Sequence, residues 1–282
     1  MRLAAYGESA LDHVEHRALY ADRVDWPAAR ASMASAAARA TTPAELHPAI
    51  GAVLRQAGGR HSGLVPPGRT GSTGARERPS ASWVDGHGVL VLPWCPGELR
   101  AVRAYAAAGG RALRRLPPVS GWVVDLRGNS GGSMWPMLAV ALPLLEASGV
   151  LGAFVTRDGS RTPWWARGHR VGTGRWASAR SRGPRRLPGP VAVLLDGGTA
   201  SSAEAVAVAF RGVSTARSYG RATHGVCTGN ETVRLRDGAL LVITSCRLAD
   251  RTGLVHDGGP LTPDVLVDDD ALDVALADLD RA

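Results

Sequence analysis

Two adjacent serines, Ser201 and Ser202, stand where an apolar run gives way to a segment rich in Ala and Val. The apolar run, residues 191–195, predicts a buried strand, and the residues after the serines predict a helix. A serine at such a turn lies beside backbone N–H groups that lack intrahelical partners, at the positive end of the helix dipole. An acyl-transfer nucleophile needs that setting, because fixed donors must meet the oxyanion that forms. Serines also cap helices without doing chemistry, so the rest of the chain must decide between the two interpretations.

Three further stretches carry polar residues of catalytic type. His61 and Ser62 lie in a Gly-rich loop after a helical region. The turn 125–132, Asp-Leu-Arg-Gly-Asn-Ser-Gly-Gly, follows a second predicted buried strand, and Asp257 opens the late segment Asp-Gly-Gly-Pro-Leu-Thr-Pro-Asp. Together with the Ala-Ser-Ser-Ala-Glu segment, residues 200–204, these motifs resemble the S41 serine peptidases, the family of the tail-specific proteases and the tricorn protease core.

The resemblance covers roughly residues 45–268 and implies that Ser201 is the nucleophile and Glu204 the matching acid. Tail-specific proteases use a downstream lysine as general base, and their pattern falls on residues 220–227, Gly-Arg-Ala-Thr-His-Gly-Val-Cys. Val226 stands at the lysine position, and the chain contains no lysine. A serine–lysine mechanism is therefore excluded on chemical grounds.

The tricorn-like branch of the family takes a histidine from an N-terminal segment instead, and His61, followed by Ser62, matches it. Asp257 matches by position an acid in front of a Gly-x-x-Pro-Asp segment, where Glu is commoner, and His256 beside it is the alternative. The resemblance thus implies a triad of Ser201, His61 and Asp257. His61 would take the serine proton and return it to the leaving amine, while Asp257 would fix the imidazole tautomer.

The oxyanion hole is expected from the Ser202 N–H together with the N–H of Gly131 or Gly132. Glycine at these positions lets the backbone approach the substrate carbonyl closely. Asn129, in the same turn, is expected to hold the turn in shape, and Glu204 and Ser62 are expected to support the site.

Residues 1–57 are rich in Ala, Arg, Glu and Leu and predict a small N-terminal helical subdomain. Residues 58–282 alternate predicted strands with predicted helices, which predicts an α/β core with helices on the faces of a sheet. This core resembles the crotonase/Clp-like fold, and the stretch between His61 and Val89 is too short for the PDZ domain of tail-specific proteases. Residues 157–186, rich in Arg, Gly and Trp, are interpreted as a solvated loop, either a lid or an interface.

The composition of the chain limits which partners and which cellular location we expect for the protein. The formal net charge is +8, yet no nucleic-acid module is recognisable, so no nucleic-acid partner is predicted. No long apolar run and no secretory signal are visible, so we expect no membrane partner and a cytoplasmic location. The 3 cysteines lack the spacing of a disulfide framework or a zinc site, and no metal or organic cofactor is expected.

The sequence therefore predicts a serine peptidase that works through an acyl-enzyme on small peptides or a dedicated partner. It is compatible with a homo-oligomer. Three alternatives stay open. The first is a catalytically idle S41-like binding module for apolar ligands, as in the interphotoreceptor retinoid-binding proteins. The second is an acyl hydrolase or transferase acting on a non-peptide ester or thioester. The third is a Cys227 nucleophile with His224 as base, although nothing in the sequence marks that thiol as activated.

Overall fold

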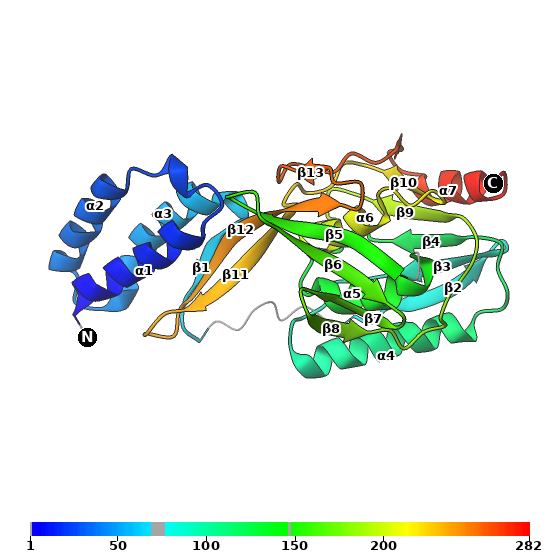
Figure 1. Ribbon diagram of the computed structural model, residues 1–282, viewed down its shortest axis with the longest axis horizontal. Helices are drawn as coiled ribbons and strands as arrows, with labels where there is room; N and C mark the ends of the chain where they lie inside the picture. Colours follow the sequence, from blue (N-terminus) through cyan, green and yellow to red (C-terminus); the bar gives the residue numbers. More distant parts are fainter. Residues whose placement is uncertain (1, 69–76, 146–147) are drawn as a thin grey trace. The chain divides into compact units, whose positions relative to one another are not determined.

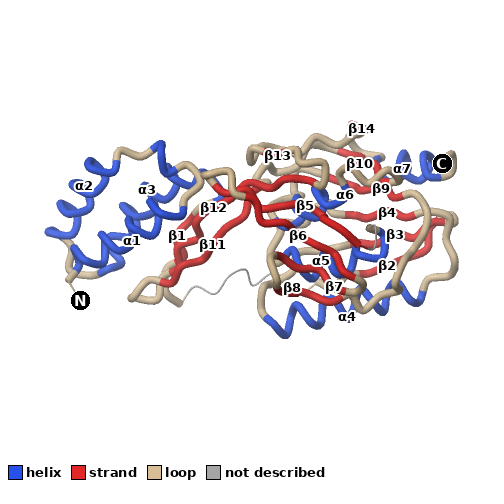
Figure 2. The backbone as a smooth tube through the Cα atoms, viewed as in Figure 1, coloured by secondary structure: helices blue, strands red, loops and turns tan. Residues whose placement is uncertain are grey.

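The computed structural model, drawn in Figure 1 and Figure 2, describes residues 2–68, 77–145 and 148–282. The chain folds into two compact units. The first comprises Met1–Gly74, Val155–Ser160 and Thr228–Arg247, and the second comprises Ala75–Phe154, Arg161–Cys227 and Leu248–Ala282. The helices expected within residues 1–57 thus share a unit with two later segments of the chain.

The first unit packs helices on a small antiparallel sheet. Its elements are α1 (Leu3–Arg17), η1 (Ala21–Arg23), α2 (Trp26–Arg39), η2 (Pro43–Leu46), α3 (His47–Gly58), η3 (Gly59–His61), β1 (Gly63–Val65), β11 (Thr228–Arg234) and the beginning of β12 (Leu240–Asp250). β1 and β11 each pair antiparallel with β12. Leu11, Ile50, Leu54, Leu241 and Ile243 are fully buried together, so the apolar faces of the helices cover the sheet.

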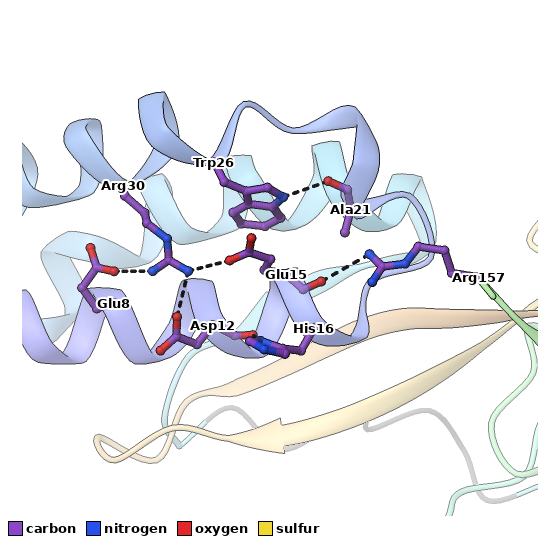
Figure 3. Close-up of polar contacts among 8 residues, drawn as sticks. All are labelled: Glu8, Asp12, Glu15, His16, Ala21, Trp26, Arg30 and Arg157. Carbon is purple, nitrogen blue, oxygen red and sulfur yellow. Dashed lines mark hydrogen bonds and ion pairs between the residues drawn. The ribbon is translucent and has the colours of Figure 1, made fainter.

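One arginine joins α1 to α2 in this unit (Figure 3). Arg30 donates to Asp12 at 2.8 Å and to Glu15 at 2.5 Å, and it also pairs with Glu8. The three acids recur at helical spacing, so they share one face of α1. Figure 3 also shows Arg157, which donates to the Glu15 carbonyl at 3.4 Å. These contacts place a concentrated charge network on the outside of the helices.

The second unit is built on a mostly parallel sheet. Its strands are β2 (Ser80–Val84), β3 (His87–Val91), β4 (Trp122–Asp125), β9 (Val191–Leu195), β10 (Ala216–Gly220) and β14 (Val265–Leu266), in the spatial order β14-β10-β9-β4-β3-β2. Only the β2–β3 pair of this sheet is antiparallel. Every residue of β9 is buried, as expected for a parallel strand covered on both faces.

Helices cover both faces of the parallel sheet. On one face, α7 (Ala271–Leu279) packs against Val123, Ala192 and Leu194. On the other, α5 (Met134–Ala141), η4 (Leu142–Leu144) and α6 (Ser202–Phe210) share the largest core cluster with the alternate residues of β4 and β9. α4 (Leu99–Arg115) packs on α5. This arrangement confirms the predicted α/β class.

Residues 157–186 do not form the loop interpreted from the sequence. They contain β6 (Arg161–Arg167), β7 (Arg170–Thr173) and β8 (Trp176–Arg180), which follow β5 (Ser148–Thr156) as an antiparallel meander with the three strands side by side in Figure 1. β13 (Val255–His256) pairs with the last residues of β12. At the end of β6 the buried Trp164 and Ala166 alternate with the partly exposed Trp165 and the exposed Arg167, which is a strand pattern that the surrounding Gly and Pro obscure.

Within the described ranges, no helix combines the length and the apolar character that a membrane span requires.

Candidate active site

Ser201 directly precedes α6, with φ +54° and ψ −112°. Among the described residues, Asp85 is the other non-glycine with a positive φ. A side-chain-bearing residue in so sparsely populated a conformation costs about 1–3 kcal/mol, so surrounding contacts must hold it. Ser201 therefore lies at a strand–turn–helix junction of the kind that the sequence predicts for a nucleophile.

The turn between β9 and Ser201 is closed by Asp196. Its Oδ1 accepts from the N–H of Thr199 at 2.9 Å and from the N–H of Gly128 at 2.9 Å. The Thr199 hydroxyl donates to the Leu126 carbonyl at 2.9 Å. These bonds join the turns that follow the neighbouring strands β4 and β9, so the two turns are fixed relative to one another.

Glu204 is completely buried in the first turn of α6. Its Oε2 accepts from the N–H groups of Ser201 at 2.7 Å and Val226 at 3.0 Å. Its Oε1 accepts from the Thr223 hydroxyl at 2.6 Å and the Gly225 N–H at 2.9 Å. Burial raises the pKa of the Glu204 carboxyl above its usual value, and the four donors oppose that shift. One side chain thus ties the backbone of Ser201 to the loop after β10.

A glycine pair places the turn after β4 against the serines. Gly131 and Gly132 have φ values of +106° and +96°. A Cβ on Gly131 would lie 2.9 Å from the Ser201 Cβ and 3.1 Å from the Ser202 nitrogen. A Cβ on Gly132 would lie 2.0 Å from the carbonyl oxygen of Cys95. Only glycine fits at either position, because both the space and the backbone conformation exclude a side chain.

Asn129 is 1% exposed and holds the glycine turn. Its Nδ2 donates to the Leu92 carbonyl at 2.7 Å, and its Oδ1 accepts from the Gly131 N–H at 2.9 Å. Its own carbonyl accepts from the Ala200 N–H at 2.9 Å. Because Asn129 engages the Gly131 N–H, the geometry favours Gly132 as the glycine that donates to an oxyanion.

The hydroxyl of Ser202 has a structural role. The Ser202 hydroxyl donates to the Gly132 carbonyl at 2.6 Å, so this side chain closes the turn. Its N–H belongs to the first residue of α6, where helix N–H groups lack intrahelical partners. Ser202 is therefore suited to contribute its backbone rather than its hydroxyl.

His61 ends η3 in the first unit and is held by the start of β11. Its Nδ1 lies 2.7 Å from the Thr228 Oγ1, and its carbonyl accepts from the Asn230 Nδ2 at 3.2 Å. The neighbouring Ser62 is buried, and its hydroxyl donates to the Thr244 Oγ1 and accepts from the Thr244 N–H, both at 2.9 Å. The predicted base thus has a hydroxyl neighbour on one ring nitrogen and a firmly anchored backbone.

Asp257, the predicted partner of the histidine, lies in the second unit, where its Oδ1 accepts from the Gly259 N–H at 3.0 Å. His256 beside it places its Nε2 3.4 Å from Asp250 Oδ2, and burial lowers the pKa of His256. The structure thus shows a local turn at Asp257 and a neighbouring carboxylate, that of Asp250, beside the alternative residue His256.

The cysteine alternative is disfavoured. Cys227 is fully buried, and burial raises the pKa of its thiol well above the usual value, with the charges of Glu204 and Asp257 adding to the shift. The thiol therefore stays protonated near neutral pH, whereas a nucleophilic cysteine must ionise.

Two threonines of this region were not singled out from the sequence. Thr223 aligns with the Thr of the tail-specific Gly-x-x-Thr pattern that begins at Gly220, so the resemblance could have identified it. Thr228 follows that pattern and has no motif of its own. It reaches His61 because β11 starts there, and strand register is not legible from a single residue.

In the parts of the chain that the structure describes, no group of three or more His, Cys, Asp or Glu side chains is placed to hold a metal ion.

Comparisons with known proteins place this chain in a family. A sequence model of Peptidase family S41 matches residues 105–267, more than half of the chain. A Nisin-resistance protein of Lactococcus lactis subsp. lactis is 28% identical over 262 residues, which cover 92% of this chain and 82% of that protein.

Solved structures share the fold. A lipoprotein from Streptococcus agalactiae superposes with a TM-score of 0.84 at 23% identity, over 100% of this chain and 97% of that one. The photosystem II D1 C-terminal processing protease superposes with a TM-score of 0.67 at 16% identity, again over 100% and 97% of the two chains. With the family match over the segment that carries the serine turn and the glycine turn, the chain belongs to Peptidase family S41 and is a serine-type peptidase.

Proposed function

We propose that this peptidase hydrolyses peptide bonds through an acyl-enzyme, with Ser201 as nucleophile, His61 as general base, and the N–H groups of Ser202 and Gly132 as oxyanion donors. The observation that carries the proposal is the left-handed backbone of Ser201, held between the glycine turn and the buried carboxylate of Glu204. Strain of this kind persists only where the surrounding structure over-determines it, and it collects at active sites.

The first half of the reaction forms the acyl-enzyme. Ser201 Oγ attacks the carbonyl carbon of the scissile bond while His61 Nε2 takes the hydroxyl proton. The tetrahedral oxyanion accepts hydrogen bonds from the Ser202 and Gly132 N–H groups. When the C–N bond breaks, His61 returns the proton to the leaving amine, and the acyl group stays on Ser201 as an ester.

The second half frees the enzyme. A water molecule gives a proton to His61 Nε2 as its oxygen attacks the ester carbonyl, and the same N–H groups receive the second oxyanion. Collapse of this intermediate breaks the ester bond and returns the proton from His61 to Ser201 Oγ. The products are a carboxylic acid and the original serine.

For Nε2 to act as base, Nδ1 must carry the ring proton. The Thr228 hydroxyl, whose Oγ1 lies 2.7 Å from Nδ1, can accept the hydrogen bond from that proton. A hydroxyl orients the ring without supplying the negative charge that a carboxylate would give to the imidazolium. Asp257 stays in the proposal as the acid that the family resemblance implies. Thr228 and Asp257 can be distinguished, because their substitutions should affect the reaction differently.

Peptides are the proposed substrates. A relative that is 28% identical over 92% of this chain is named for resistance to nisin, so nisin is the first substrate that we would test. Mass spectrometry of nisin after incubation with the enzyme would detect cleavage directly. Intact nisin would redirect the search to other small peptides.

The decisive experiment is intact-mass spectrometry after reaction with a fluorophosphonate probe. Wild type and Ser202→Ala should each gain a single adduct, and Ser201→Ala none, because only the Ser201 hydroxyl is the nucleophile. His61→Ala should react with the probe at least about a thousandfold more slowly than wild type, because its serine lacks a base. An adduct on Ser201→Ala would overturn the assignment of the nucleophile. No adduct on wild type would favour an idle binding module.

The cytoplasmic location expected from the sequence stays a prediction, which fractionation of the source cells would test.

A further inference from the structure

The outward face of the β6–β7–β8 meander carries an arginine row. Arg167 on β6 is directly opposite Arg170 on β7, and Arg170 is directly opposite Arg180 on β8. All three are exposed. Neighbouring strands lie about 4.8 Å apart, so the backbones of the three arginines stand side by side across the sheet and their side chains leave from the same face.

The charge of the whole chain is concentrated on this segment. Residues 159–195 contain eight arginines and no Asp or Glu. The net charge of the full chain is +8, so the remaining residues carry equal numbers of basic and acidic side chains.

Nothing within the described chain neutralises the arginine row. Across the ranges that the structure describes, no ion pair links Arg167, Arg170 or Arg180 to a carboxylate. Like charges directly opposite one another destabilise a sheet. The opposite face of the meander is already packed, because Trp164, Ala166 and Val171 are buried in the core. The row thus presents an unbalanced charge that an external anion would stabilise.

Two tryptophans accompany the row. Arg167 lies over the Trp165 ring at 5.1 Å, and Arg175 lies over the Trp176 ring at 5.0 Å. The Trp165 indole N–H donates to the Gly174 carbonyl at 2.8 Å, which fixes that ring on the meander. Trp176, at the start of β8, is 69% exposed. An exposed indole beside arginines is the side-chain combination found at the boundary between water and lipid headgroups.

We propose that this arginine row, with Trp176, docks the protein on the surface of a bilayer that contains anionic phospholipids. Guanidinium groups bind lipid phosphates in bidentate fashion, and a basic cluster gains about 1 kcal/mol per residue near an anionic surface. A single-stranded nucleic acid fits less well, because it stacks on successive open aromatic faces. Here a guanidinium already covers one face of each ring.

The proposal departs from the expectation of no membrane partner. That expectation rested on the absence of an apolar run long enough to span a bilayer, which bears on crossing and not on surface attachment. The sequence also predicts a loop for residues 157–186, and a loop would not align three arginines.

The test is co-sedimentation of the full chain with vesicles of phosphatidylcholine, with and without phosphatidylglycerol. Wild type should bind only the vesicles that contain phosphatidylglycerol, and high salt should release it. The triple variant Arg167→Gln, Arg170→Gln, Arg180→Gln should bind about a hundredfold more weakly. Trp176→Ala should weaken the part of the vesicle binding that persists when the salt concentration is raised.

The matched control removes the same charge from another exposed surface, with Arg100→Gln, Arg103→Gln and Arg111→Gln on α4. Its binding should stay within about threefold of wild type, and both triple variants should keep the wild-type circular dichroism and melting temperature. Equal loss of binding in the two triple variants would overturn the proposal, as would equal binding of wild type to both kinds of vesicle. Binding of single-stranded DNA at a salt concentration where the vesicles are not bound would also overturn it, and would reassign the row to nucleic acid.

Discussion

The two regions that carry the proposed catalytic groups are held in different ways. Ser201 occupies a sparsely populated backbone conformation, and a fully buried carboxylate with four hydrogen-bond donors keeps it there. His61 ends a short 3-10 turn, and its ring Nδ1 lies 2.7 Å from the neutral hydroxyl of Thr228. Backbone geometry therefore fixes the nucleophile, whereas a side-chain contact orients the base.

The free energy of unfolding and the reaction rate should therefore be coupled at one of these regions and not at the other. Changes around Ser201 disturb buried polar groups, so they should lower both the free energy of unfolding and the rate. Changes beside His61 affect the direction of a ring whose backbone is anchored separately, so they should lower the rate alone. Each prediction below tests one side of that contrast.

The largest effect is expected from Glu204→Ala. The change leaves four buried donors without their acceptor, and we expect it to lower the free energy of unfolding by about 3–5 kcal/mol. Urea titration would measure this loss, and the probe should no longer label Ser201. Asp269→Ala, at an exposed acid of the same unit, is the control and should stay within about 0.5 kcal/mol of wild type. A stable, reactive Glu204→Ala would show that the backbone of Ser201 does not need the carboxylate.

The charge state of Glu204 can be tested separately with Glu204→Gln. Because the pKa of this carboxyl is raised in the folded chain, the folded state holds the proton more tightly than the unfolded state. Its contribution to the free energy of unfolding is therefore greatest in acid and is lost as pH rises above the ordinary value of 4.5. The difference in stability between wild type and Glu204→Gln should therefore fall as the pH rises above 4.5. A difference that rises instead would mean that the four donors outweigh burial.

Substitutions in the glycine turn test directly whether its backbone sets the reactivity of Ser201. Gly131→Ala would place a Cβ 2.9 Å from the Ser201 Cβ, so we expect labelling of Ser201 to slow by about a hundredfold or more. Gly128→Ala, in the same turn, also has a positive φ, but nothing lies within 4 Å of its added carbon. It should cost about 1 kcal/mol of stability and leave labelling nearly unchanged. Equal labelling rates in the two variants would separate the glycine turn from the catalytic geometry.

The sequence predicts some of these regions better than others, because some depend on local patterns and others on contacts between distant segments. The strand at 191–195, the serine turn and the glycine turn were legible, because apolar runs and Gly-rich turns are local signals. The meander was not, because Gly and Pro surround a short alternation in which Trp164 and Ala166 are buried and Trp165 and Arg167 are less so. Thr228 was not legible either, since the register of distant segments brings it to His61. The pairing of His61 with Asp257 stays a prediction of the resemblance.

A smaller effect, confined to rate, is expected from Thr228→Val. The variant keeps the shape of the side chain but removes the oxygen that faces His61 Nδ1, so we expect kcat to fall about 10- to 100-fold. Thr228→Ser restores the hydroxyl and should recover most of the activity, while the melting temperature of both variants stays close to that of wild type. Asp257→Asn separates the two candidate partners, because loss of a carboxylate facing the ring would also move the midpoint of the pH–rate profile downward. A wild-type kcat in Thr228→Val together with a large loss in Asp257→Asn would return the orienting role to the acid.

The smallest effect is expected far from either catalytic group, at the ion network of the N-terminal helices. Arg30 faces three acids that are 34–54% exposed, so each pair is screened and contributes little, and the loss in Arg30→Gln should be about 1–2 kcal/mol. Part of that loss is repulsion among acids that share one helix face, so it should shrink at high salt. Arg39→Gln, at an exposed arginine on the same helix, is the matched control for thermal unfolding followed by circular dichroism. Labelling of Ser201 should be unaffected in both, because stability of the helices and reactivity of the serine rest on different contacts. A slower labelling rate in Arg30→Gln alone would break that separation and tie the helical part of the chain to catalysis.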